Sequence, residues 1–127
     1  MYINWNPNPE GSLISDSVIR AISKLFDWSW DEVFLKLVTE AYFIKDMPSS
    51  DRVWGEFLRK RCYHKIVVPD TCHQCYTVRE FCDDHPEGKY LAATGNAVIA
   101  VINGDYYDSF DSGNEIVIYY WRRNAVQ

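Results

Sequence analysis

The chain lacks any apolar run near the roughly 20 residues that a membrane-spanning helix needs. It also lacks a basic stripe of the kind that follows a nucleic-acid backbone. Acidic residues outnumber basic ones, 18 to 13, and are scattered along the sequence. The first eleven residues lack the basic segment and the long apolar core of a secretory signal. We therefore expect a cytoplasmic protein that binds neither membranes nor nucleic acid.

Cysteine is sparse, and a cytosolic setting argues against disulfides. The four cysteines are Cys62, Cys72, Cys75 and Cys82. Together with His85, the last three have the ligand types and number of a zinc site. The competing interpretation is a helix that starts after Thr77, with Glu80 closing a capping box. Phe81 and Cys82 would then lie on its apolar face, so we expect Cys82 in the core and no metal.

Apolar residues are plentiful by contrast: they make up 47% of the 127 residues, and aromatic residues make up 16%. This suits one compact domain over residues 1–127, with residues 1–14 as an extended lead-in. Periodicity and capping predict helices over 16–26, 30–42, 51–61 and 78–84, and strands over 65–69, 90–94, 97–102, 106–110 and 116–121. Helices that precede strands indicate an α+β fold, with N-terminal helices packed on a C-terminal antiparallel sheet.

A hairpin is the strongest local prediction. Asn103-Gly104 separates two strand-like runs and favours a two-residue turn. That turn places Ile102 opposite Asp105 and fixes the register of the pair. Continued along the strands, this register puts Ala97 and Asp108 on one face as diagonal neighbours.

Three short stretches resemble the site of the papain-like cysteine peptidases. They are SDSVIRAIS around Ser17, GNAV around Ala97, and YYDSFDSG around Asp108. The family carries a nucleophile at a helix start, a histidine at a strand start, and an amide or carboxylate on the next strand. Over residues 6–121 the chain resembles small papain-like proteins encoded by bacteria and their phages.

The resemblance implies a papain-like fold and a role for each site position. Ser17 stands where the family has the nucleophilic cysteine, and Ala97 stands where it has the histidine base. Asp108 stands at the position that orients the base, with Asp111 as the alternative, although the register places Asp111 on the other face. A serine hydroxyl needs a general base to become a nucleophile, and alanine supplies none. We therefore expect a peptidase site in an inactivated form.

The function predicted in this way is that of a thiol hydrolase of a peptide or other amide bond, present as an inactivated form of the enzyme. Its partner would be a peptide or protein substrate, and no cofactor is expected. The oxyanion would be held by the backbone N–H of residue 17 and by Asn6 or Asn8. Two alternatives stay open: a transferase with the same acyl-enzyme chemistry, and a natural pseudoenzyme that binds a protein, such as a phage inhibitor of a host factor. The sequence does not predict the oligomeric state.

The same residues also have plainer interpretations. Ser17 is a common residue type in the first turn of a helix. Asp108 can form hydrogen bonds at a strand end without any catalytic role. Arg20, near one helical turn after Ser17, either pairs with a carboxylate or is solvated. Only the spatial arrangement of residues 17, 97 and 108 distinguishes these interpretations from a peptidase site.

Overall fold

The computed structural model describes residues 1–69 and 76–125, which form an α+β fold of four helices and a six-stranded mixed sheet. In chain order the elements are β1 (Tyr2–Asn4), α1 (Ser17–Phe26), α2 (Trp30–Ile44), α3 (Asp51–Arg59), β2 (Tyr63–Val67), α4 (Val78–Asp84), β3 (Lys89–Ala93), β4 (Val98–Ile102), β5 (Asp105–Asp108) and β6 (Tyr119–Arg123). No helix among the described residues is both long and apolar enough to cross a bilayer.

Two of the helices start where capping chemistry predicts. The Ser29 side chain accepts a hydrogen bond from the backbone N–H of Glu32 (3.1 Å) at the start of α2. Thr77 does the same for Glu80 (3.2 Å) at the start of α4. Each cap satisfies a backbone donor that has no partner within the helix. The capping box predicted at Thr77 is therefore confirmed, and Ser29 marks a second capped helix start.

The predicted hairpin turn is also confirmed. Asn103 and Gly104 both have positive φ, 51° and 80°, as a two-residue turn with the twist of its strands requires. Ile102 pairs with Asp105, which is the register expected from that turn. The ladder between β4 and β5 ends at the pair of Ala100 with Tyr107.

The sheet differs from the prediction at one edge. The strand order is β1-β5-β4-β3-β6-β2, and all neighbours are antiparallel except β1, which runs parallel to β5. The expectation of an antiparallel sheet preceded by an extended lead-in is therefore wrong for Tyr2–Asn4. A three-residue strand is too short to show a period of two, so its pairing across about 100 residues leaves no local signal.

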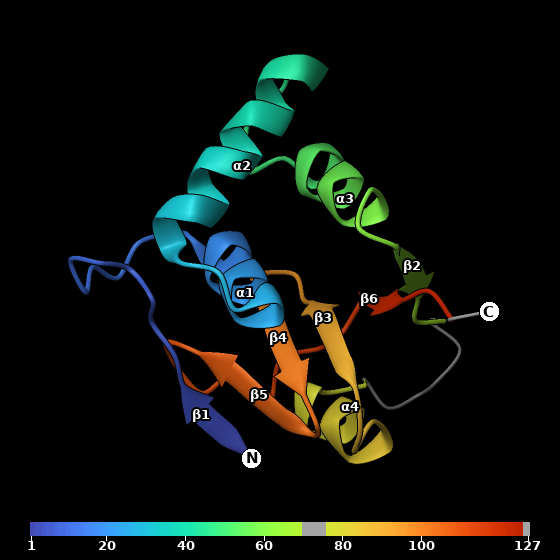
Figure 1. Ribbon diagram of the computed structural model, residues 1–127. Coiled ribbons are helices and arrows are strands. Elements are labelled where there is room, and N and C mark those ends of the chain that lie inside the picture. The colour runs from blue at the N-terminus through green and yellow to red at the C-terminus, as the bar shows by residue number, and fades with distance from the viewer. Residues whose placement is uncertain (70–75, 126–127) are drawn as a thin grey trace.

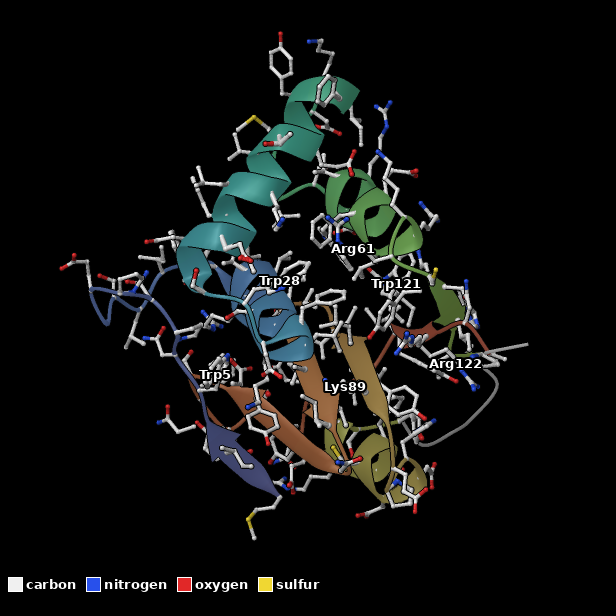
Figure 2. All side chains as sticks on the ribbon, viewed as in Figure 1. Trp5, Trp28, Arg61, Lys89, Trp121 and Arg122 are labelled. Atoms are coloured by element: carbon white, nitrogen blue, oxygen red, sulfur yellow. The ribbon has the colours of Figure 1, made fainter. Side chains whose placement is uncertain are left out.

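Helices cover both faces of the sheet (Figure 1). The helix α1 packs along β4 with α2 and α3 beyond it, and this layer includes the core residues Ile22, Leu25, Leu37, Phe57 and Trp121. The helix α4 covers the opposite face with Val78, Phe81 and Cys82. Side chains fill the space between α3 and the sheet, where Figure 2 shows Trp28, Arg61 and Trp121. The central strands β3 and β4 are thereby largely buried, and the start of α1 is held against the start of β4.

Candidate active site

Ser17 is the first residue of α1, and it touches the start of β4. The backbone N–H of Val98 donates a hydrogen bond to the Ser17 Oγ (3.1 Å), a contact between residues 81 positions apart. The helix is strongly amphipathic, and Ala21, Ile22 and Leu25 lie buried against the sheet. Burial of this apolar face fixes the helix on β4 and so holds residue 17 beside the strand.

Ala97 lies immediately before β4, in a tight turn that Thr94 stabilises. The Ala97 N–H donates to Thr94 Oγ1 (3.0 Å), and the Thr94 N–H donates to the Ala97 carbonyl (2.9 Å). These two bonds fix the backbone of Ala97 next to the Val98 N–H that contacts Ser17. A side chain at position 97 is therefore anchored close to a side chain at position 17.

Asp108 ends β5 and is almost completely buried, with 1% of its surface exposed. Its Oδ1 accepts hydrogen bonds from the Arg20 guanidinium (3.1 Å) and from the backbone N–H of Ser109 (2.7 Å). Its Oδ2 is buried and has no hydrogen-bond partner among the described residues. A buried carboxylate oxygen without a donor is costly, and such an atom often marks a functional position.

Arg20 joins Asp108 to a second buried carboxylate, that of Asp16. The guanidinium forms ion pairs with both groups, and all three side chains are at most 7% exposed. Asp16 also accepts a hydrogen bond from the Trp30 indole N–H (2.8 Å). We call Asp16, Arg20 and Asp108 the buried ion cluster. With both carboxylates ionised it carries one net negative charge, and charges removed from water need a counter-charge close by.

A cleft opens over these residues. A hollow of about 530 Å³ is lined by Ser17, Arg20, Asn96, Ala97 and Ser109, among others. A second hollow of about 390 Å³ extends past Thr94 and Tyr119 and shares Ser17 and Ala97 with the first. The two hollows thus form a continuous cleft that passes over positions 17 and 97. No histidine of the described residues lines it.

The other residues proposed from the sequence lie elsewhere. Asp111 pairs with Arg79 of α4 (3.1 Å) on the opposite side of the sheet, and it accepts a hydrogen bond from the Tyr106 hydroxyl (2.5 Å). The Tyr106 bond, a backbone N–H and Arg79 hold the pKa of Asp111 below its usual value. Asn6 and Asn8 use their side chains within their own loop, and neither lines the cleft.

Cys82 packs in the core on α4, as its helical position predicts, and burial raises the pKa of its thiol to about 11. His85 lies on the same side of the sheet, with its Nδ1 2.8 Å from the Phe81 carbonyl oxygen. Cys72 and Cys75, the other ligands of the considered zinc site, lie outside the described residues. Over residues 1–69 and 76–125, no group of three or more His, Cys, Asp or Glu side chains is placed to bind a metal.

Sequence reasoning missed the buried ion cluster. The sequence predicts no role for Asp16, and it is equally compatible with an Arg20 that pairs with a carboxylate and one that is solvated. The spacing of four residues between them is a common ion-pair spacing on helices. That spacing is a local signal for the pair of Asp16 and Arg20. The bond from Arg20 to Asp108 spans 88 residues, so no local signal predicts it.

Comparisons of the chain with models of known families, with curated proteins and with solved structures gave no match.

Proposed function

We propose that this chain is a papain-like thiol peptidase or amidase in an inactivated form. Residue 17 occupies the nucleophile position, residue 97 the general-base position, and Asp108 the position that orients the base. The observation that carries the proposal is the contact between Ser17 and the start of β4, in a cleft whose neighbouring buried carboxylate leaves Oδ2 without a donor. An imidazole at position 97 is the group that would use this oxygen.

The chemistry follows from these positions once a cysteine and a histidine stand at 17 and 97. The helix N-terminus and an imidazolium both favour a thiolate at residue 17. The thiolate attacks the amide carbonyl carbon, and the imidazolium gives its proton to the departing amine. Water then hydrolyses the thioester: the imidazole takes the proton of the water, and the thiolate leaves as the acid forms. Asp108 would accept the other imidazole N–H and so fix the tautomer.

The present chain lacks the groups that these reaction steps need. Ser17 Oγ accepts a backbone hydrogen bond, and no histidine of the described residues lines the cleft to remove its proton. The carboxylate that does line it, Asp51, accepts hydrogen bonds from the Trp54 indole and the Tyr119 hydroxyl. The inactivated form would still bind a peptide in the cleft. A transferase would use the same acyl-enzyme, with an acceptor other than water.

The test is to restore the pair with Ser17→Cys and Ala97→His and to measure alkylation by iodoacetamide at pH 6. Peptide mapping assigns a rate to each cysteine. We expect the thiol introduced at position 17 to react at least about tenfold faster than the exposed Cys62, because a thiolate forms only where the pKa is lowered. The matched control is Ser17→Cys with Ala97 retained, in which the thiol at position 17 should react at a rate much closer to that of Cys62. Circular dichroism checks that both variants fold.

A second candidate is a natural binding protein that uses the cleft without catalysis. Two exposed apolar residues on the cleft favour it: Leu13 is 78% exposed and Phe110 is 48% exposed. In that case the thiol at position 17 of the restored variant reacts no faster than Cys62. This result would remove the peptidase proposal and leave binding as the function.

A further inference from the structure

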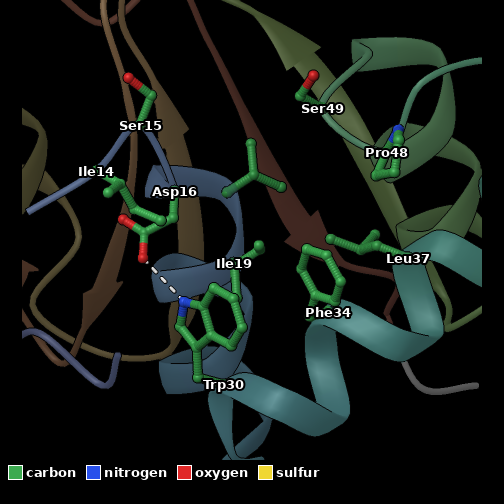
Figure 3. A pocket seen from close by; sticks show the side chains of 10 residues that line it. Ile14, Ser15, Asp16, Ile19, Trp30, Phe34, Leu37, Pro48 and Ser49 are labelled. Carbon is green, nitrogen blue, oxygen red and sulfur yellow. Dashed lines mark hydrogen bonds between the residues drawn. The ribbon is translucent and has the colours of Figure 1, made fainter. Parts of the chain in front are cut away.

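An apolar pocket opens beside the cleft, between the first turns of α1 and α2 and the loop that leads to α3 (Figure 3). Its volume is about 290 Å³. We call it the α1–α2 pocket, and its apolar walls come from Val18, Ile19, Trp30, Phe34, Leu37 and Pro48. The rings of Trp30 and Phe34 stack with centres 5.1 Å apart, which makes one wall flat and rigid.

The pocket offers no free charge to a ligand. Its one charged lining group is Asp16, whose carboxylate is already bonded to the Trp30 indole N–H and to Arg20. No lysine or arginine of the described residues lines it. A polar ligand group would lose water there and find few partners, whereas an apolar group would gain by leaving water.

The pocket is continuous with the cleft. Ile14, Ser15, Val18 and Ser49 line both spaces. Val18 follows Ser17 directly, so a peptide bound with an amide at position 17 passes within reach of the pocket mouth. Leu13 and Ile14 are 78% and 53% exposed at this junction, which extends the apolar surface from the pocket into the cleft.

We propose that the α1–α2 pocket binds an aliphatic or aromatic side chain of the peptide that occupies the cleft. The substrate class is therefore a peptide with a bulky apolar residue close to the amide at position 17. The placement of that amide rests on the proposed function. The preference of the pocket for an apolar side chain does not, so it is tested without catalysis.

The test uses the chain with Ser17 and Ala97 in place. The indole N–H of Trp30 lines the pocket and gives a resolved reporter in ¹⁵N NMR spectra. The probes are N-acetyl-leucinamide and its near-isosteric polar counterpart N-acetyl-asparaginamide. We expect the leucine probe to shift the Trp30 signal with an affinity at least about tenfold above that of the asparagine probe, the discrimination an apolar pocket achieves.

Two variants on α2 locate the effect. Phe34→Asp puts a carboxylate on the pocket wall and should abolish the preference for leucine. Phe43→Asp, at a position 73% exposed and outside the pocket lining, is the matched control and should retain it. The proposal is overturned if the asparagine probe binds as well as the leucine probe, if neither shifts Trp30, or if both variants behave alike.

The outcomes separate this inference from the proposed function. Fast alkylation at position 17 of the restored variant, together with no leucine preference at Trp30, would leave the peptidase proposal and remove the pocket. A leucine preference at Trp30 without fast alkylation would keep the pocket as a binding site and remove the catalytic proposal.

Discussion

Replacing Arg20 with methionine should destabilise the chain more than the loss of any surface charge. Arg20 is the one cation of the buried ion cluster, and it pairs with Asp16 and Asp108, which are 4% and 1% exposed. Methionine retains most of the apolar length of the side chain but leaves two carboxylates buried together without a counter-charge. Removal of one partner from a buried pair costs about 3–5 kcal/mol.

This cost is large compared with the total stability of a domain, which is about 5–15 kcal/mol. The urea midpoint, followed by tryptophan fluorescence, should fall by about 2 M for a denaturant slope of about 1–3 kcal/mol/M.

The matched control is Arg52→Met. Arg52 is an exposed helical arginine without an ion pair among the described residues, and its replacement should change stability by no more than about 0.5 kcal/mol. If the unfolding free energy of Arg20→Met lies within about 1 kcal/mol of that of the parent chain at pH 7, the buried ion cluster does not stabilise the fold.

Three further predictions concern stability. Gly113→Ala should cost about 1–3 kcal/mol in urea unfolding, because the new Cβ would clash with the Tyr106 hydroxyl, whereas Gly95→Ala meets nothing within 4 Å and should be nearly neutral. Burial and the Asp111 hydrogen bond raise the pKa of Tyr106 to about 12. The melting temperature of the parent chain should therefore fall between pH 10 and 12, because the unfolded state loses the Tyr106 proton more readily than the folded state. The melting temperature of Tyr106→Phe should fall less over the same range. Ser29→Ala removes the cap of α2 and should lower the unfolding free energy by about 1 kcal/mol; a change below about 0.3 kcal/mol would contradict this.

The parts of the fold that local chemistry determines could be predicted. The caps at Ser29 and Thr77 and the turn at Asn103-Gly104 each depend on residues within four positions of one another, so their signals survive without tertiary contacts. The edge strand β1 could not be predicted, because its pairing with β5 depends on a partner about 100 residues away. The strand β6 lies at 119–123 rather than 116–121. An apolar run shows that a strand exists, but its neighbours set its ends.

The candidate site also has parts that the sequence predicts and parts that it does not. The motifs placed Ser17 and Ala97, and the structure brings these positions together in one cleft. The hairpin register does not reach Asp108. The ladder ends at Ala100 and Tyr107, so strand alternation does not determine where the Asp108 side chain points. Arg20 determines it, through a bond that no local pattern reveals.

The buried ion cluster holds Asp108 in place through bonds that do not involve residue 97. The two carboxylate oxygens of Asp108 have different surroundings. Oδ1 is bound by Arg20 and by the Ser109 backbone, and these bonds hold the carboxylate in place whatever side chain stands at position 97. Oδ2 is the oxygen left over. Under the proposed function, an alanine at position 97 removes the reaction without removing the bonds that position the carboxylate. Under that proposal the chain would stay folded with an intact cleft and would bind a peptide without cleaving it.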